Sequence, residues 1–248
     1  MPRTPRPLLL AGLLALLAVV VTVALPAPGP RAAASTDPAA RTDPAARTET
    51  ASTDAAALSD DTTPVREPVM TVLSYNIHHG VGEDGRLDLP RIADVIATSG
   101  ADVAALAEVD RHWSARSDWA DQAAVLAGML GMHVAYGANL DLDPPAPGGP
   151  RRQYGTAILS RYPIVSAHNT PLPNLGGEQR GLLAARLVVG GRPVLVHATH
   201  LQHNSATERA AQAAAIVDLV GSATEPVVLA GDLNAAPGAP ELAPLEAS

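Results

Sequence analysis

The sequence has no cysteine, no phenylalanine and no lysine, and only 2% of its 248 residues are aromatic. The absence of cysteine excludes disulfide bonds, thiolate metal sites and cysteine nucleophiles. Because lysine is also absent, all 17 basic residues are arginines, and 25 acidic residues outnumber them, giving a formal net charge of −8. Apolar residues still make up 47% of the chain, which is enough for one sizeable hydrophobic core.

The first 34 residues are typical of an export signal. Arg3 and Arg6 precede a continuous apolar run from Leu8 to Leu25, and small residues at 32–34 offer a cleavage site. A run of about 18 apolar residues is also close to the shortest that spans a bilayer, so an uncleaved membrane anchor is the alternative. In either case the rest of the chain faces outward. We therefore expect a protein that is secreted or anchored on the outer face of the cytoplasmic membrane.

Residues 35–68 are rich in Ala, Thr, Asp and Pro, and the phrase TDPAAR occurs twice among them. The segment has no aromatic residue and almost no large aliphatic one. Such a composition buries too little apolar surface to offset the entropy lost on folding. We therefore expect a disordered linker over 35–68, followed by one folded domain over 69–248.

Short apolar runs and capped apolar stripes alternate along this domain. Strands are expected over 70–75, 102–106, 133–136, 154–160, 164–170, 181–189, 193–200 and 227–230, and helices over 88–100, 119–130 and 205–221. Hairpins fill the middle of the order, and strand–helix–strand units lie at both ends. This order predicts an α/β fold of stacked β-sheets with helices on the outside.

Four of the expected strands lead into polar residues: Asn76, Glu108, His200, and the pair Asp232 and Asn234 in the phrase PVVLAGDLNAAP. Ligands of open α/β sheets bind just beyond the carboxyl ends of the strands. These residues are therefore expected to share one site. A purely structural alternative exists for the last pair, because Asp and Asn readily form Asx turns at strand ends.

The side chains of this set indicate one kind of chemistry. Carboxylate and amide oxygens without sulfur suit Mg²⁺, or Mn²⁺, better than Zn²⁺. An imidazole beside them serves proton transfer or the stabilisation of an anion. A metal ion with a histidine and an aspartate fits the hydrolysis of a phosphate ester, where negative charge builds on the oxygens.

At these positions the chain resembles the endonuclease/exonuclease/phosphatase superfamily, the DNase I-like proteins, and most closely its small bacterial metal-dependent hydrolases. The matching phrases are LSYNIHHG, DVAALAEVD, YGTAILSRYP, VHATHLQHN and VVLAGDLNAAPG, which together cover about 69–238. The resemblance implies a four-layer α/β sandwich with the active site at the edges of the two sheets. It also implies dependence on a divalent cation, Mg²⁺ by preference.

The resemblance further implies a role for each residue. Glu108 would be the main metal ligand, and Asn76 would touch the metal or the phosphate beside it. Asp232 would orient or activate the attacking water. Asn234 would hold a phosphate oxygen, and His200 would hydrogen-bond the scissile phosphate.

Two further residues are candidates for substrate binding. Arg180 precedes an expected strand, and its guanidinium suits phosphate oxygens; the alternative is a solvated position at the end of a hairpin. His78 lies two residues after Asn76, where some relatives carry an acid, and either His78 or His79 would reach the metal. The alternative is that both are ordinary loop histidines.

One departure from the family concerns the C-terminal end of the domain. The family carries an Asp and then an adjacent Asp-His after the GDLN phrase, on strands that complete one sheet. Only ten residues follow Gly238 here, and none of them is Asp or His. The expected fold therefore lacks its last strands, through truncation or natural shortening. The non-enzymatic alternative is a pseudo-hydrolase that binds phosphate without turnover.

Charge bears on the substrate. From residue 69 onward the chain has 11 arginines against 18 acidic residues, whereas non-specific binding to DNA depends mainly on positive charge. We therefore expect a phosphodiesterase or phosphatase that acts on a small or lipid phosphate, with a secreted endonuclease as the alternative. The membrane is an expected partner only if the N-terminal segment is retained, and no protein partner is indicated.

Overall fold

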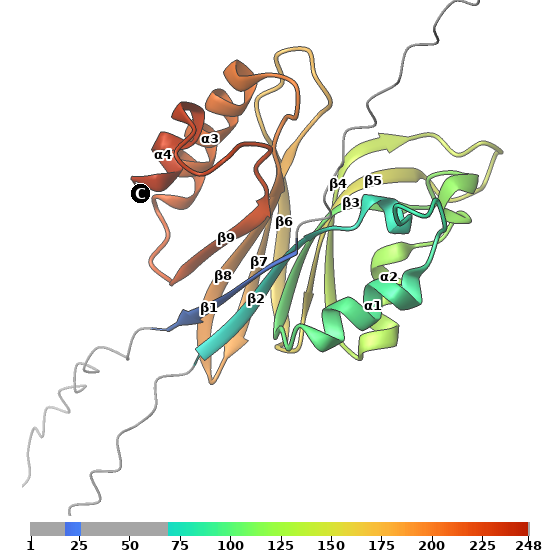
Figure 1. Ribbon diagram of the computed structural model, residues 1–248, viewed down its shortest axis with the longest axis horizontal. Helices are drawn as coiled ribbons and strands as arrows, with labels where there is room; N and C mark the ends of the chain where they lie inside the picture. The colour runs from blue at the N-terminus through green and yellow to red at the C-terminus, as the bar shows by residue number, and fades with distance from the viewer. Residues whose placement is uncertain (1–17, 26–68, 248) are drawn as a thin grey trace, which may run out of the picture. The chain divides into compact units, whose positions relative to one another are not determined.

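The computed structural model describes residues 18–25 and 69–247, so the expected cleavage site and linker lie outside the described residues. The strands, helices and short 3₁₀ helices follow one another along the chain as shown in Figure 1. They are β1 (Ala18–Ala24), β2 (Val69–Asn76), η1 (His78–Gly80), α1 (Leu89–Thr98), β3 (Val103–Arg111), η2 (Ala115–Ser117), α2 (Gln122–Leu130), β4 (His133–Leu142), β5 (Arg152–Ser160), β6 (Ile164–Pro171), β7 (Gly181–Val189), β8 (Arg192–His200), α3 (Ala206–Val220), β9 (Val227–Asp232), η3 (Pro240–Leu242) and α4 (Ala243–Glu246).

The strands form two mixed sheets, ordered β1-β2-β3-β5-β4 and β6-β7-β8-β9. Each sheet contains one parallel pair, β2 with β3 and β8 with β9, and its other pairs are antiparallel. Parallel strands end at the same edge of a sheet. Asn76 therefore lies opposite Ala107 on β3, and His200 lies opposite Asp232 on β9.

Three layers of apolar packing hold the fold together. The first, with Leu106 and Leu126, lies between the five-stranded sheet and helices α1 and α2. The second, with Ile158 and Leu187, lies between the two sheets, and the third lies between the four-stranded sheet and α3, η3 and α4. The order of layers is helix, sheet, sheet, helix (Figure 1). This arrangement confirms the predicted four-layer α/β sandwich.

The helices begin where side chains satisfy their free backbone N–H groups. The Asp88 carboxylate accepts a hydrogen bond from the Arg91 N–H, and the Ser205 hydroxyl accepts one from the Glu208 N–H, as the capping patterns predicted. The expected start of α2 near 119 is wrong. The helix begins at Gln122, because the Asp121 side chain caps it by accepting from the Ala124 N–H.

Two strands are longer than their apolar runs predicted. β3 was expected to end at Leu106, but it continues to Arg111 after a shift of register against β5. β4 was expected to end at Tyr136, but it continues to Leu142 along the same partner. In both cases pairing with β5 extends the strand, because the ladder hydrogen bonds satisfy the backbone where the side chains have become polar.

Part of the expected signal or anchor segment contributes a strand to the first sheet. β1 pairs antiparallel with β2, and Leu25 beyond it is only 1% exposed, while Val23 packs against the layer between the sheets. Within the described residues, no helix has the length and apolarity needed to span a membrane. The export or anchoring role of residues 1–34 stays a prediction.

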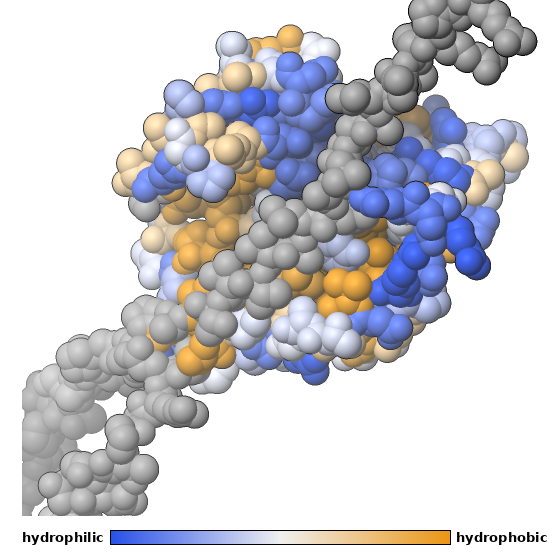
Figure 2. Space-filling model, viewed as in Figure 1, coloured by the Kyte–Doolittle hydropathy of each residue, from blue (hydrophilic) through white to orange (hydrophobic). Residues whose placement is uncertain are grey.

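Strand β9 is less covered than its neighbour β8. Val227 is 37% exposed, and the remaining residues of β9 are half-buried; Figure 2 shows hydrophobic surface over this strand. A cavity of about 250 Å³ separates β9 from β2, with Val72, Leu229 and Leu233 among the residues that line it. Its lining is mainly apolar, so the polar chemistry lies beyond it, at the strand ends.

Candidate functional site

Asn76, the last residue of β2, links the two sheets through its carboxamide. The amide nitrogen donates to Glu108 Oε1 at 2.8 Å and to Asp232 Oδ2 at 3.0 Å. The amide oxygen accepts from the backbone N–H of His78 at 3.0 Å, which fixes the direction of the carboxamide. One amide group thus holds a carboxylate from each sheet at the same place. The expected direct contact of Asn76 with a metal stays a prediction.

Glu108 reaches this place because β3 bulges. The register against β5 shifts between Leu106 and Val109, and Glu108 adopts a left-handed backbone with φ of 57°. Bulges redirect side chains next to active sites. The sequence placed Glu108 at the end of its strand. In the structure, a bulge within β3 directs the Glu108 side chain into the site.

Asp232 and Asn234 combine a turn with a place in the site. The Asn234 N–H donates to Asp232 Oδ1 at 3.0 Å, which is the Asx turn that the sequence offered as a structural alternative. The other carboxylate oxygen of Asp232 faces Asn76, so the turn and the site use different atoms of the same side chain. The Asn234 amide nitrogen donates to the Leu201 carbonyl at 2.9 Å and is anchored at the end of β8.

His200, the last residue of β8, is 5% exposed and has a distinct partner on each ring nitrogen. Nδ1 lies 3.0 Å from Nη1 of Arg180, and Nε2 lies 3.9 Å from Oδ2 of Asp232. Arginine only donates, so Nδ1 accepts and the ring proton lies on Nε2. Burial, together with the charge of Arg180, lowers the pKa of His200 to about 4 against the opposing charge of Asp232. The imidazole is therefore neutral at pH 7, and the contact with Asp232 is not an ion pair.

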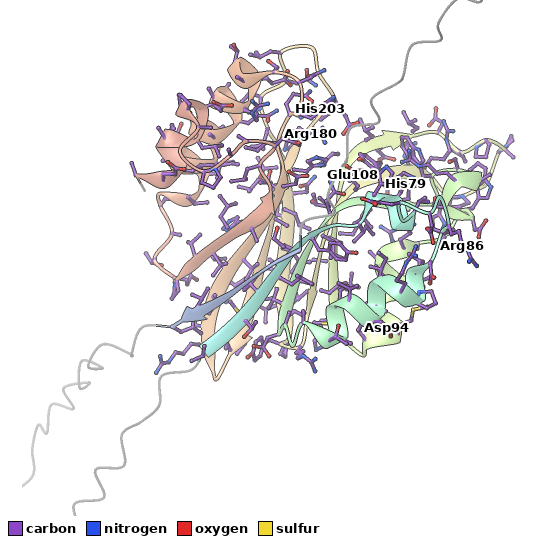
Figure 3. All side chains as sticks on the ribbon, viewed as in Figure 1. His79, Arg86, Asp94, Glu108, Arg180 and His203 are labelled. Carbon is purple, nitrogen blue, oxygen red and sulfur yellow. The ribbon has the colours of Figure 1, made fainter. Side chains whose placement is uncertain are left out.

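Arg180 is 3% exposed, unlike the solvated hairpin position that the sequence offered as an alternative. Its guanidinium lies 2.8 Å from Glu178 Oε1 and also contacts His200. These contacts support a positioning role, in which Arg180 sets the tautomer of His200. Direct binding of a phosphate by Arg180 stays a prediction. Figure 3 shows Arg180 and Glu108 directed to the same end of the two sheets.

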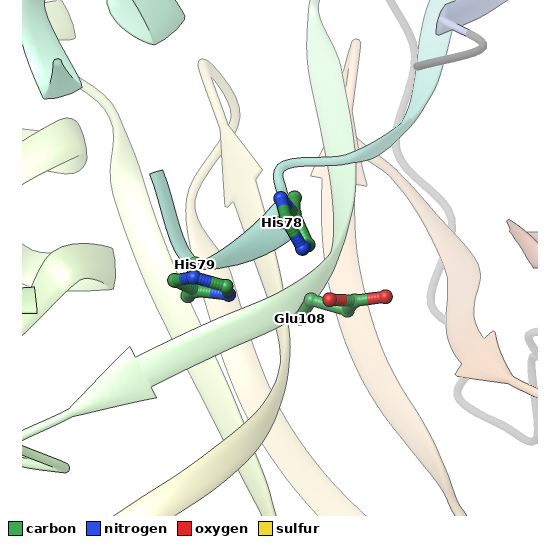
Figure 4. A group of neighbouring side chains, drawn as sticks. All are labelled: His78, His79 and Glu108. Atoms are coloured by element: carbon green, nitrogen blue, oxygen red, sulfur yellow. The ribbon is translucent and has the colours of Figure 1, made fainter. Parts of the chain in front are cut away.

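His78 and His79 are the first two residues of the turn η1, which Ile77 joins to Asn76. One ligand atom from each of His78, His79 and Glu108 lies within 4.8 Å of the other two (Figure 4). Burial, together with the charges of Arg116 and His78, lowers the pKa of His79 to about 4, so its ring is neutral at pH 7. Carboxylates with neutral imidazoles form a donor set that fits a divalent cation. Glu108, His78 and His79 are the residues that would hold it.

Tyr154 lies close enough to the site to feel the charge of Glu108, and the sequence analysis did not predict it. Tyr154 lies near the start of β5, and its ring packs against Trp113 and Arg116. Burial raises the pKa of its hydroxyl, with a further contribution from the charge of Glu108, so Tyr154 stays protonated beside the carboxylate. No local pattern distinguishes it from other strand residues, because its proximity to Glu108 depends on the pairing of β5 with β3.

Comparison with known proteins gives relatives of the same fold. The Escherichia coli (strain K12) protein YbhP is 34% identical over an alignment of 174 residues, and the match covers 66% of this chain and 66% of the relative. An endonuclease/exonuclease/phosphatase from Beutenbergia cavernae, known from a crystal structure, is 36% identical with a TM-score of 0.58. The match covers 68% of this chain and 50% of the Beutenbergia chain. A Bacteroides thetaiotaomicron mannosyl-6-phosphatase of known structure is 18% identical with a TM-score of 0.53. The match covers 71% of this chain and 69% of the phosphatase chain.

The chain thus spans about two thirds of the length of the curated relatives that it matches and half of the Beutenbergia chain. The family model described as "Endonuclease/Exonuclease/phosphatase family" matches residues 73–248. This match covers more than half of the chain and includes every residue of the site described above. The chain therefore belongs to the endonuclease/exonuclease/phosphatase family.

Proposed function

We propose that this chain hydrolyses phosphate esters at the site around Asn76, with the help of a divalent metal ion. One observation carries the proposal. Carboxylates from two different sheets, Glu108 and Asp232, converge on a single amide group, and the neutral ring of His200 lies beside them. Membership of the family supports the same chemistry.

Each side chain has a task in such a reaction. Glu108 would hold the ion, which supplies positive charge to the oxygens of the phosphate when it is bound. Asp232 accepts hydrogen bonds and would orient the attacking water. His200 carries its proton on Nε2, the nitrogen on the side of Asp232, and would donate it in a hydrogen bond to a phosphate oxygen. Asn234 has one amide hydrogen beyond its bond to Leu201 and would donate it to another.

The arginines of the domain favour a small or lipid phosphate over DNA as the substrate. Of the 11 arginines from residue 69 onward, at least seven form ion pairs with acidic side chains: Arg91, Arg111, Arg116, Arg151, Arg180, Arg186 and Arg209. A duplex-binding surface needs cations that neutralise backbone phosphates. Arginines balanced by neighbouring carboxylates serve that purpose poorly, so endonuclease activity is the less favoured form of the proposal.

The first experiment measures hydrolysis by the full chain. Bis-p-nitrophenyl phosphate, p-nitrophenyl phosphate and supercoiled plasmid would each be incubated with Mg²⁺, Mn²⁺ or EDTA. We expect turnover of a nitrophenyl ester that needs metal and falls about 10²–10³-fold in Glu108→Gln, the usual cost of removing one charge-stabilising group. Glu83→Gln, at an exposed loop position, is the matched control and should keep full activity.

Two results decide between this proposal and its alternatives. Cleavage of plasmid without turnover of the small esters would identify an endonuclease and overturn the preference for small substrates. A folded protein that binds metal but turns over none of the three substrates would overturn the enzymatic proposal and favour a phosphate-binding pseudo-hydrolase.

We also propose that the protein acts outside the cytoplasm. The basic pair Arg3 and Arg6, the apolar run of 8–25 and the small residues at 32–34 support this proposal. Phospholipid headgroups and other phosphate esters that occur outside the cytoplasm would then be within reach of the site.

A further inference from the structure

The three candidate metal ligands share an unusual backbone conformation. His78, His79 and Glu108 have φ values of 46°, 45° and 57°, in the left-handed region that non-glycine residues rarely adopt. Such conformations are energetically unfavourable and persist where the surrounding structure enforces them. They bring two imidazoles and a carboxylate to one point from two separate elements, η1 and β3. Figure 4 shows a ring nitrogen of each histidine directed toward Glu108.

The histidine turn is held by contacts that do not use the side chains of the three ligands. Gln122, at the start of α2, donates from its side chain to the His79 carbonyl at 2.6 Å, and its oxygen accepts from the Asp110 N–H at 2.9 Å. Gly80 closes the turn in a buried position where an added Cβ would lie 2.9 Å from Leu87 and Leu89. The turn is therefore fixed by the fold and is not a free loop.

The hydrogen bonding of His78 leaves one of its nitrogens available as a ligand. Nδ1 lies 3.2 Å from the carbonyl oxygen of Val81. A carbonyl only accepts, so Nδ1 carries the proton and Nε2 has the lone pair. Metal-binding histidines typically donate their other N–H to a backbone carbonyl in this way, which fixes both the tautomer and the direction of the ring.

The charge around the cluster is compatible with a cation. Arg116 is the positive side chain that acts on His79, and it makes two hydrogen bonds of 2.7 and 2.8 Å to Asp110, which is fully buried. That carboxylate offsets the guanidinium charge. Glu108 adds a second carboxylate to the surroundings, and Asp232, which shares the amide group of Asn76 with it, adds a third.

We propose that His78 and His79 bind the metal ion together with Glu108, and that this site prefers a first-row transition ion to Mg²⁺. The proposal deepens the proposed function, since it rests on a metal ion at Glu108 and names the ion class that the site selects. Mg²⁺ strongly favours oxygen ligands and keeps much of its water, whereas imidazole is a good ligand for first-row transition ions. Two imidazoles for each carboxylate therefore shift the preference away from Mg²⁺.

The test measures metal binding by the full chain, with Mn²⁺ as the probe. Electron paramagnetic resonance gives the dissociation constant of Mn²⁺ and, by competition, that of Mg²⁺. Pulsed measurements report nitrogen nuclei that are bonded to the ion. We expect Mn²⁺ to bind at least about tenfold more tightly than Mg²⁺ and to show couplings to imidazole nitrogen.

Substitutions identify which histidines are responsible. His78→Ala and His79→Ala should each weaken Mn²⁺ binding at least about tenfold and remove one nitrogen coupling, while the affinity for Mg²⁺ changes much less. His168→Ala, at an exposed position on β6, is the matched control and should bind Mn²⁺ as the unchanged protein does. Wild-type protein without nitrogen coupling would overturn the proposal even if a variant failed to fold.

The outcomes separate this inference from the proposed function. A protein that shows nitrogen-coupled Mn²⁺ and hydrolyses no ester retains the metal site and overturns the proposed activity. A protein that hydrolyses esters equally well with Mg²⁺ and Mn²⁺, without nitrogen coupling, retains the activity and overturns the histidine ligation.

Discussion

Arg180 and His200 form a pair in which one side chain determines the protonation of the other. The guanidinium donates to Nδ1 of His200, which places the ring proton on Nε2. The same positive charge adds to burial in keeping the ring neutral. A histidine in this state is a hydrogen-bond donor at pH 7 and not a general base. Arg180, which the sequence suggested as a phosphate-binding residue, is thus better placed to set the protonation of His200.

The lowered pKa of His200 predicts a pH dependence of stability. Its folded-state pKa of about 4 lies below the ordinary value of 6.5, so the unfolded chain binds more protons between these two values. The free energy of unfolding should therefore fall as the pH decreases from 6.5 toward 4, by on the order of 2–3 kcal/mol from this residue. Above pH 6.5 the effect should be absent.

Urea unfolding of the wild type and of His200→Gln at pH 4.5, 5.5 and 7 measures this contribution. Other buried histidines contribute to both proteins, so the difference between the two profiles isolates His200. The variant should lose less stability on acidification than the wild type does. Parallel profiles would show that His200 titrates normally in the folded protein.

At the scale of the elements, the close approach of β8 and β9 depends on a glycine. Gly231 has φ of 148°, and a Cβ at this position would lie 2.0 Å from the Thr199 carbonyl oxygen. The neighbouring residue is Asp232, whose carboxylate belongs to the site. The bulge in β3 acts similarly for Glu108. Both carboxylates are thus aimed by local departures from regular strand geometry.

Gly231→Ala should destabilise the protein and displace Asp232. The backbone conformation alone costs about 1–3 kcal/mol for a residue with a side chain, and the overlap with Thr199 adds to this cost. Gly148→Ala is the matched control, since Gly148 also has a positive φ but nothing lies within 4 Å of its Cβ position. Urea unfolding should show a larger loss for Gly231→Ala. Equal losses would mean that β8 and β9 separate without cost.

At the scale of the whole molecule, the site exists only where the two sheets meet. Asn76 and Glu108 come from the five-stranded sheet, and His200 and Asp232 come from the four-stranded one. The first sheet also includes β1, from the segment that the sequence predicts to be an export signal or anchor. A signal removed by cleavage would take β1 with it and leave β2 at the edge of the sheet.

A reporter fusion tests the export of the chain. Residues 1–68 joined to an alkaline phosphatase, which is active only outside the reducing cytoplasm, should give an active enzyme in a bacterial host. Changing Leu14 and Leu16 to arginine should abolish this activity, because charge in the apolar run opposes insertion into the membrane. Changing the same two residues to isoleucine is the matched control. Activity that survives the arginines would argue against the apolar run as the export signal, and an inactive unchanged fusion would argue against export.

The mass of the exported fusion then shows whether the signal is cleaved. A new N-terminus near Ser35 would mean that β1 is absent from the mature protein. An intact N-terminus would mean that residues 18–25 stay with the domain, as a membrane anchor or as the strand β1.

The sequence by itself determined the kinds of elements and the chemistry at their ends. Apolar runs and cap residues such as Asp88 and Ser205 act through neighbouring residues, so they are readable without the fold. The polar residues at the strand ends predicted a shared site because the ends of parallel strands meet at one edge. Asn76, Glu108, His200 and Asp232 do lie together, with Glu108 brought to the others by the bulge within β3 and not by a strand end.

Only the tertiary structure decided how these residues are oriented and what surrounds them. The hydrogen bond from Asn76 to Asp232 joins residues that are 156 positions apart, and it depends on how the two sheets pack. The bulge at Glu108, the burial of Arg180 and the approach of His79 to Glu108 likewise follow from contacts between distant elements. Local periodicity carries no information about such contacts, because they are set by the packing free energy of the whole fold.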